Sequence, residues 1–270
     1  MSVRVELLII GNEILSGLIQ DTNSQWLAQR LLQLSLPVRY ATVVEDDVEI
    51  IARTLRAGCD RGTQILITSG GLGPTFDDRT AEALARAAEV ASEFNEQALT
   101  MIEERLQLLH AQGLISSSEL TPPRRKMAFL PRGAEPLHNS VGTAPGIAYK
   151  LGSTRIYCLP GVPRELQAIF TSEVQPRLIP LAKEAVVEEV VEVPFLDESV
   201  LVPAINTILA TERGVYLKTL LSLREFRRPL RIAVTVTADT QAKARQVLQH
   251  VIQRLERATK PPRPSRRTES

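Results

Sequence analysis

Short apolar runs alternate with segments of helical periodicity through the first half of the chain, and this alternation restricts it to few folds. The runs Val3–Ile10, Val38–Val44 and Thr63–Thr68 are rich in Val, Ile and Leu, as buried strands are. Between them, Asn23–Leu34 and Asp47–Gly58 repeat their apolar residues at helical spacing. A β-α-β-α-β order predicts a three-layer α/β fold, with helices on both faces of a mainly parallel sheet.

Helix boundaries are also visible in the sequence. Asp47 is expected to cap the second of these helices, with Gly58 near its C-terminal end. A longer helical pattern runs from about Asp78 to His110, with a break near Ser92. The segments GIAYKL and TRIYCL, which follow a Pro-rich stretch, are predicted to be two further strands.

The order of predicted elements changes at about residue 171. Strands over AVVEEVVEV, VYLKTLLS and RIAVTVTA, a helix from Glu198 and another from Thr240 give the order β-α-β-β-α. We therefore expect an α/β domain over residues 1–170 and a smaller α+β domain over 171–258. Residues 259–270 are rich in Pro, Arg and Ser, a composition typical of a disordered basic tail.

Charge and composition exclude several classes of protein. The net charge is +1 and aromatic residues make up 4%, so neither a field that attracts nucleic acid nor a base-stacking surface is expected. The two cysteines form no C-x-x-C pair, which indicates neither a zinc site nor a disulfide framework. The sequence contains neither the apolar region of a signal peptide nor an apolar stretch long enough to span a membrane, so we expect a cytoplasmic protein without a membrane partner.

The stretch TSGGLGPTFDD, Thr68–Asp78, follows the third predicted strand. Its glycines permit backbone conformations in which successive amides point into one concavity, and such a nest binds phosphate or carboxylate oxygens. Adjacent carboxylates at Asp77 and Asp78 are the ligands that a hard divalent cation prefers. The alternative is a tight strand-to-helix turn, with one of the two aspartates as N-cap and Thr80 in the first helical turn.

Other loops are expected at the same edge of the sheet, because ligands in such folds bind beyond the carboxyl ends of the strands. GNEILSGLIQDTN follows the first strand and offers Glu13, Asp21 and Asn23. As an alternative to a binding role, Asp21 or Thr22 would cap the following helix. NSVGTAPG and LPGVPRE are two more loops rich in small residues and proline.

In that order, these four motifs closely resemble the amino-terminal part of CinA (competence/damage-inducible) proteins, within the wider MoaB/Mog-like, molybdopterin-binding group. The resemblance implies a three-layer α/β/α domain, a following KH-like module, and a homo-oligomer, with a dimer favoured. The second domain has only Gly214 and so no G-X-X-G loop, which makes nucleic acid an unlikely partner. CinA proteins commonly carry a deamidase domain at the carboxyl end, and this sequence stops before any such domain, so deamidation is not expected of it.

The resemblance implies a nucleotide pyrophosphatase that splits ADP-ribose, or a related dinucleotide diphosphate such as FAD, into AMP and a phosphorylated product. A divalent cation, cobalt or magnesium, and potassium would assist. An alternative is a binding protein for molybdopterin or a nucleotide without hydrolysis, and a third is a purely structural interaction protein. Metal-dependent turnover separates the first two, and ligand-induced stabilisation separates both from the third.

Carried over position by position, the resemblance gives Asp77, Asp78 and Glu13 catalytic roles, with the two aspartates as metal ligands. The expected substrate-binding residues are Asp21, Asn23, Ser69, Gly70, Gly71, Gly73, Thr80, Lys126, Gly142, Thr143, Pro145 and Gly146. Two segments depart from the family pattern. The usual Gly-Asp after the second strand is replaced at Glu45–Asp47, and the usual Asn-x-Lys-Gln-Ala reads RRKMA at Arg124–Ala128, which keeps only the Lys and Ala.

Overall fold

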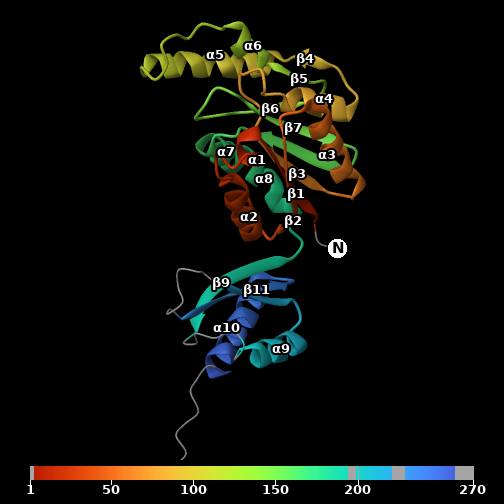
Figure 1. The fold of residues 1–270 in the computed structure, drawn as a ribbon, viewed down its shortest axis with the longest axis vertical. Helices are drawn as coiled ribbons and strands as arrows, with labels where there is room; N and C mark the ends of the chain where they lie inside the picture. The colour runs from red at the N-terminus through yellow and green to blue at the C-terminus, as the bar shows by residue number, and fades with distance from the viewer. Residues whose placement is uncertain (1–2, 194–198, 200, 221–228, 259–270) are drawn as a thin grey trace, which may run out of the picture. The chain divides into compact units, whose positions relative to one another are not determined.

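The structure, a computed structural model, describes residues 3–193, 199, 201–220 and 229–258, and it divides into two compact units between Ala182 and Lys183 (Figure 1). The division lies beyond the expected boundary at residue 170, because the chain continues there as helical turns that belong to the first unit. Phe170, Val174 and Leu178 are fully buried in the core of that unit. The expected basic tail, 259–270, lies outside the described residues.

The first unit is built on a six-stranded sheet with the strand order β2-β1-β3-β8-β7-β6. The strands are β1 (Val5–Ile10), β2 (Val38–Val44), β3 (Ile65–Ser69), β6 (Glu135–Leu137), β7 (Gly146–Leu151) and β8 (Thr154–Leu159). The first three strands and β8 pair in parallel, as expected. Strands β7 and β8 form an antiparallel hairpin instead, which turns at Gly152, where φ is 59°.

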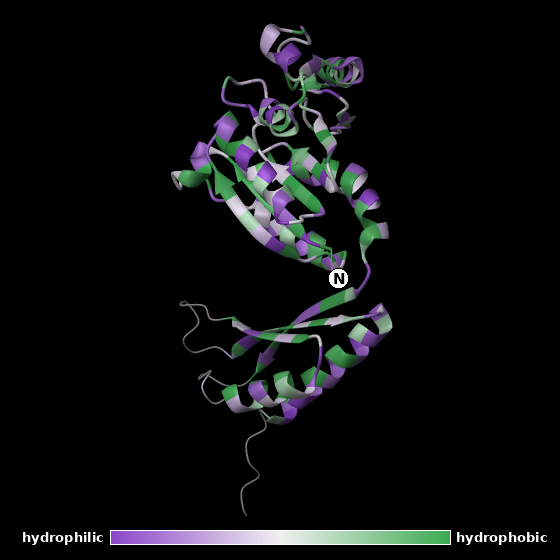
Figure 2. Ribbon diagram, turned by 90° about the vertical axis from the view of Figure 1, so that its right-hand side faces the viewer, coloured by the Kyte–Doolittle hydropathy of each residue, from purple (hydrophilic) through white to green (hydrophobic). Residues whose placement is uncertain are grey.

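Both faces of this sheet are covered, which makes the unit the three-layer α/β fold that the sequence predicts. Alternate residues of β1 point to opposite faces, so Leu7 and Ile9 belong to one core cluster and Leu8 and Ile10 to the other. Apolar residues dominate the central strands in Figure 2. One face packs against α2 (Asn23–Gln33), α7 (Pro163–Ile169), the π-helical turn η1 (Phe170–Val174), α8 (Gln175–Leu178) and η2 (Ile179–Leu181).

The other face packs against α3 (Val48–Asp60), α4 (Thr80–Ala88) and α5 (Glu96–Ala111). Asp47 caps α3 as expected, since its carboxylate accepts from the amides of Glu49 and Ile50. Gly58 lies in the last turn of that helix, near its C-terminal end as expected, and the helix ends at Asp60. The predicted break near Ser92 is a short strand that separates the last two helices. Four short elements complete the unit: α1 (Asn12–Leu15), β4 (Ser92–Phe94), α6 (Pro122–Lys126) and β5 (Phe129–Pro131).

The second unit has the predicted β-α-β-β-α order, with its antiparallel strands arranged β10-β11-β9. Its own core contains the fully buried Ile232, Val234 and Val236 of the central strand, packed with Val251 and Leu255 of the last helix. The predicted helix start at Glu198 and strand end at Ser222 lie outside the described residues. The elements are β9 (Ala185–Val193), α9 (Val202–Thr211), β10 (Val215–Leu220), β11 (Leu230–Ala238) and α10 (Gln241–Ala258).

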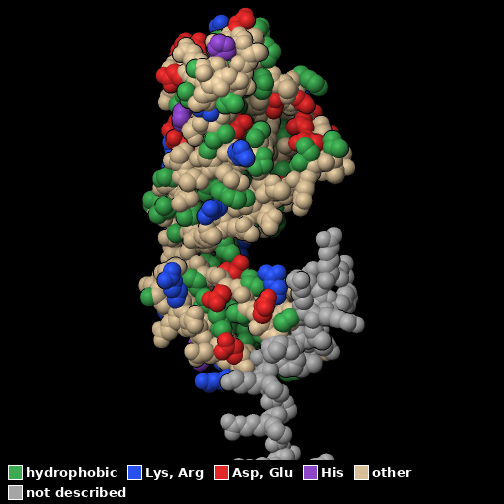
Figure 3. Space-filling view, turned by 90° about the vertical axis from the view of Figure 1, so that its left-hand side faces the viewer, with side chains coloured by type: hydrophobic (Ala, Val, Ile, Leu, Met, Phe, Trp, Pro, Cys, Tyr) green, Lys and Arg blue, Asp and Glu red, His purple; other side chains and the backbone are tan. Residues whose placement is uncertain are grey.

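Two global features bear on partners. Every helix among the described residues is too short or too polar to traverse a bilayer. On the face of the first unit drawn in Figure 3, Lys and Arg side chains are scattered singly among acidic and apolar ones, so that face has no continuous basic patch.

Candidate functional site

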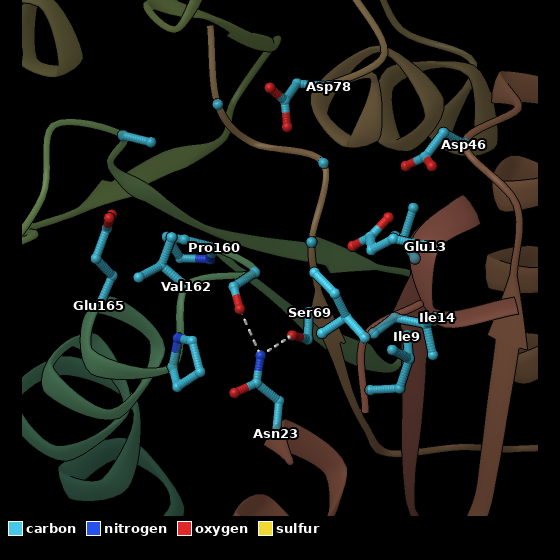
Figure 4. Close-up of a pocket in the computed structure, with 18 of the residues that line it drawn as sticks. Ile9, Glu13, Ile14, Asn23, Asp46, Ser69, Asp78, Pro160, Val162 and Glu165 are labelled. Atoms are coloured by element: carbon cyan, nitrogen blue, oxygen red, sulfur yellow. Dashed lines mark hydrogen bonds between the residues drawn. The ribbon is translucent and has the colours of Figure 1, made fainter. Parts of the chain in front are cut away.

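A cavity of about 590 Å³ opens beyond the carboxyl ends of the parallel strands in the first unit (Figure 4). Its walls come from the segments that follow β1, β2, β3 and β8, together with Thr143 and Ala144 from the loop before β7. This is where ligands bind in open α/β sheets, and the volume is within the range of small-molecule pockets. The four loops placed at this edge by the sequence therefore do converge.

The cavity wall is strongly acidic. Among the described residues, six carboxylates line it, and no Lys or Arg side chain does. Four of them, Glu13, Asp46, Asp77 and Asp78, are here called the acidic corner. Figure 4 shows that Glu13, Asp46 and Asp78 lie on one side of the cavity and Glu165 on the opposite side. The remaining carboxylate belongs to Asp21.

The glycine loop after β3 has the backbone conformation of an anion nest only in part. Gly70 and Gly71 have φ angles of 111° and 68°, a region that favours glycine. The amide of Gly70 donates to the carbonyl oxygen of Leu159 at 2.9 Å, so it is not available to a phosphate, contrary to expectation. The amides of Gly71 and Gly73 have no acceptor among the described residues, and both glycines line the cavity.

Thr80 supports this loop from behind. Its side chain is fully buried, and Oγ1 donates to the carbonyl oxygen of Gly70 at 2.7 Å while its amide donates to the carbonyl oxygen of Gly71 at 2.9 Å. Thr80 does not line the cavity. The substrate-binding role expected for it is therefore replaced by a supporting one, which fixes the carbonyls on the far side of the nest.

Asp77 and Asp78 are held by Thr75 rather than by helix α4. The amide of Thr75 donates to Asp78 Oδ2 at 2.9 Å, and its hydroxyl lies 2.5 Å from Asp77 Oδ1. That hydroxyl is the main cause that lowers the pKa of Asp77, with a smaller contribution from the charge of Lys126. The N-cap position of α4 is Arg79, with no side-chain cap bond, so the capping alternative for the two aspartates was wrong.

Lys126 also contacts this loop from outside the cavity. Its Nζ donates to the carbonyl oxygen of Asp78 at 2.7 Å and to that of Thr75. The side chain borders a small neighbouring depression and not the main cavity. The expected contact of Lys126 with substrate is therefore not available in this conformation, and the ammonium group instead holds the backbone that carries the acidic pair.

Asp46 is a site residue that the sequence reasoning missed. Burial raises its pKa, and the charges of Glu13, Asp77 and Asp78 add to that effect, while a bond from the amide of Asn12 to Asp46 Oδ2, 2.8 Å long, opposes it. Its signal was present, because Asp46 lies two residues after the end of a parallel strand and belongs to the segment that departs from the family pattern. The carboxylate of its neighbour Asp47 does not take part in the site, because it accepts the capping hydrogen bonds of α3.

The acidic corner suits a cation only together with a ligand. Within the described part of the chain, no three His, Cys, Asp or Glu side chains converge closely enough to hold a metal ion by themselves. Carboxylate oxygens are nevertheless the donors that Mg²⁺ prefers, and Mg²⁺ commonly uses one or two of them plus phosphate oxygens and water. The expected ligands Asp77 and Asp78 fit such a shared site.

Asn23 ties two of the loops together. Its Nδ2 donates to Ser69 Oγ at 2.9 Å and to the carbonyl oxygen of Gly161 at 2.7 Å, which joins the end of β3 to the loop after β8 (Figure 4). Both Asn23 and Ser69 line the cavity, as expected. The capping role next to Asn23 goes to Asp21, whose carboxylate accepts from the amide of Ser24 at 3.0 Å.

The loop NSVGTAPG is organised by Asn139 around Glu165. Asn139 Nδ2 donates to Glu165 Oε2 at 2.7 Å and to the carbonyl oxygen of Ala144 at 2.8 Å, and its Oδ1 accepts from the amide of Gly142 at 2.8 Å. A Cβ atom at Gly142 would lie 2.0 Å from the Glu165 carboxylate. A side chain at position 142 would therefore displace the Glu165 carboxylate from this position, and Gly142 itself does not line the cavity.

Of the four residues predicted in this loop, only Thr143 lines the cavity. Pro145 borders the small depression near Lys126, and Gly146 is buried as the first residue of β7. Glu165 was missed as a site residue, although LPGVPRE was recognised as a loop at this edge. Burial raises the pKa of Glu165, while the bond from Asn139 and the charge of Arg105 oppose this.

The fold and the cavity together define an α/β protein with a cavity of small-molecule size beside a glycine loop and an acidic corner. Comparison with known proteins gives the family. Residues 6–179 match the family model described as a probable molybdopterin binding domain, and the chain belongs to that family.

Relatives match over most of their length. A protein of Pyrococcus horikoshii is 40% identical over 204 residues, which are 76% of this chain and 79% of the relative. One of Pyrobaculum arsenaticum is 37% identical over 248 residues, 91% of each chain. A crystal structure described as the protein CinA with unknown function, from Thermoplasma acidophilum, is 34% identical with a TM-score of 0.58, and the match covers 65% of this chain and 99% of that one.

Proposed function

We propose that the protein is a divalent-cation-dependent hydrolase that splits ADP-ribose or a related dinucleotide diphosphate, such as FAD, into AMP and a phosphorylated product. The observation that supports this most directly is the lining of the cavity, with six carboxylates, no Lys or Arg among the described residues, and unbonded loop amides. The carboxylates would repel a diphosphate unless a cation lies between them. A cation–diphosphate complex satisfies both groups.

Each part of the chain then has a role. The amides of Gly71 and Gly73 would donate to phosphate oxygens, and Asp77 and Asp78 would hold the cation. When bound, the cation supplies positive charge to the diphosphate. The Glu13 carboxylate accepts no hydrogen bond from the described residues, so it is free to take a proton from the attacking water. Potassium would be a second, monovalent cation, and we expect the active form to be a homo-oligomer, with a dimer favoured.

The second candidate is a binding protein for molybdopterin or a nucleotide that does not hydrolyse its ligand. Two observations favour it. The acidic corner lacks three convergent metal ligands among the described residues, and Lys126, which would stabilise phosphate charge, is bonded to loop carbonyls. The altered segment Arg124–Ala128 contains that lysine, so loss of hydrolysis is consistent with the change in sequence.

One experiment separates the two functions. Purified protein is incubated with ADP-ribose or FAD, with magnesium or cobalt and with potassium, and AMP is quantified by chromatography. The double variant Asp77→Ala/Asp78→Ala is the control, and its melting temperature is checked against the parent. AMP from the parent alone supports the hydrolase.

Absence of AMP with a ligand-dependent rise in melting temperature supports the binding protein, since a ligand at 100 times its dissociation constant adds about 2.7 kcal/mol. If the parent protein gives neither AMP nor a ligand-dependent rise in melting temperature, both proposals are overturned. Light scattering of the same sample gives the oligomeric state, and a monomer that releases AMP at full rate would contradict the expected dimer.

A further inference from the structure

The two ends of the cavity differ in chemistry. The acidic corner and the loop amides suit a cation and phosphates. On the side opposite the acidic corner, Figure 4 shows Glu165 beside Pro160 and Val162, and Ala144 and Pro163 also line the cavity. Apolar walls beside a carboxylate suit a flat heteroaromatic ring, which has apolar faces and a polar edge.

One oxygen of Glu165 is committed to the protein and the other is not. Oε2 accepts from Asn139 Nδ2 at 2.7 Å, whereas no described residue donates to Oε1. The carboxylate packs against Gly142, since a Cβ atom at that position would lie 2.0 Å from it. Asn139, which is 4% exposed, fixes this arrangement by binding the loop and the carboxylate together.

We propose that Glu165 determines the specificity of the site by accepting, at Oε1, a hydrogen bond from the amino group of the substrate's base, so that the site selects adenine nucleotides over purines without the amino group. This inference rests on the proposed function, because it places the base of the nucleotide diphosphate at the end of the cavity opposite the acidic corner. A half-buried acceptor without a partner penalises any ligand that cannot donate to it. Burial of Glu165, which raises its pKa, adds to that penalty for the ionised carboxylate.

The substitution Glu165→Gln gives a sharp test because it keeps the size of the side chain. The amide oxygen of Gln must face Asn139 Nδ2, since two donors would otherwise meet, and its NH₂ group then replaces the acceptor at Oε1. An amino group on the base would meet a donor there. Glu165→Leu removes both atoms, and Glu103→Gln, an exposed position on α5 outside the cavity, is the matched control.

The experiment measures dissociation constants of AMP and of purine riboside 5′-monophosphate, which differ only in the amino group, by calorimetry with magnesium. We expect the parent and Glu103→Gln to bind AMP about tenfold more tightly than they bind purine riboside 5′-monophosphate. In Glu165→Leu this ratio of affinities should fall to about one, and in Glu165→Gln, where two donors would meet, to about one or below. The melting temperature of each variant is compared with that of the parent. A ratio of about one in the parent, or an unchanged ratio in both variants, would overturn the inference.

The failure of the proposed function would give a different result. If the parent binds neither nucleotide and releases no AMP from ADP-ribose, the proposed function fails, and the role of Glu165 fails with it. If the parent releases AMP but binds the two nucleotides equally, only the role of Glu165 is wrong.

Discussion

Lys126 Nζ donates a 2.7 Å hydrogen bond to the backbone carbonyl oxygen of Asp78, so a positive charge lies directly behind the loop that carries the acidic pair. A second bond from the same ammonium group reaches the carbonyl oxygen of Thr75. These two carbonyls bracket the segment whose carboxylates face the cavity. The lysine therefore sets the position of Asp77 and Asp78 without touching the ligand space.

Replacing Lys126 by Met should loosen that loop and weaken cation binding. We expect the magnesium concentration for half-maximal AMP release to rise about tenfold, as for loss of a hydrogen bond to a charged group, with kcat at saturating magnesium largely kept. Lys126→Arg keeps the charge and should restore part of the affinity. If Lys126→Met lowered kcat with no change in magnesium dependence, the lysine would act on the reaction itself.

Glu13→Gln separates activity from stability. Its carboxylate accepts no bond from the described residues, so we expect the free energy of unfolding to stay within about 0.5 kcal/mol of the parent. Loss of the proton acceptor should slow AMP release by about 100-fold or more. Asp78→Asn is the comparison, because it also weakens the bond from the Thr75 amide and should cost about 1 kcal/mol of stability. Full activity in Glu13→Gln would remove Glu13 from the mechanism.

Gly70→Ala should be among the most destabilising single substitutions in the first unit. The added Cβ would lie 2.2 Å from the carbonyl oxygen of Ile10, at a φ of 111° that side chains rarely adopt. We expect a loss of about 3 kcal/mol or more in urea unfolding. Gly17→Ala is the matched control, since φ is 73° there but nothing lies within 4 Å, and about 1 kcal/mol is expected. Equal losses would mean that strain, not crowding, dominates.

The stability of Glu165→Gln relative to the parent should depend on pH. Burial raises the pKa of Glu165 above 4.5 in the folded state, so the folded protein holds this proton to a higher pH than the unfolded chain. Stability from this group is present below the unfolded pKa and is lost as pH rises through the folded pKa. The free energy of unfolding of the variant, which cannot ionise at this position, should therefore rise relative to that of the parent as pH increases above about 4.5.

The stability of Glu135→Gln relative to the parent should change with pH in the opposite direction. Arg177 donates to both oxygens of Glu135 at 2.7 Å and lowers its pKa, so its contribution is present above the unfolded pKa and is lost as pH falls. The free energy of unfolding of this variant should therefore fall relative to that of the parent as pH rises, measured in the same series of denaturant titrations. Parallel pH trends in the two variants would contradict the assigned causes.

The parts of the fold that periodicity encodes were predictable. Val38–Val44 was predicted with the bounds of β2, and the capping role of Asp47 follows from one residue type at one position. The antiparallel hairpin of β7 and β8 was predictable but was missed, because only Gly152 and Ser153 separate the two predicted strands. A two-residue Gly-Ser connection indicates a hairpin, whereas parallel strands need a crossover of about a dozen residues or more.

The site was predictable as a set of loops but not atom by atom. The sequence identified Gly70, Thr80 and Lys126, yet a backbone amide, a hydroxyl and an ammonium group each turn out to bond the protein rather than face the cavity. The contact between Asn139 and Glu165 joins two loops that are separate in sequence, and no local pattern specifies it. Residue type indicates what a side chain can do, whereas its direction is decided by tertiary packing.

The close approach of Gly70 to the carbonyl oxygen of Ile10 has a consequence for the evolution of this family. Because any side chain there would wedge two central strands apart, selection for folding alone would preserve that glycine after catalysis was lost. A descendant without activity would then still display much of the glycine motif. The presence of the glycine motif therefore reports on architecture, and a test of the proposed hydrolysis has to target residues that the scaffold does not need, such as Glu13.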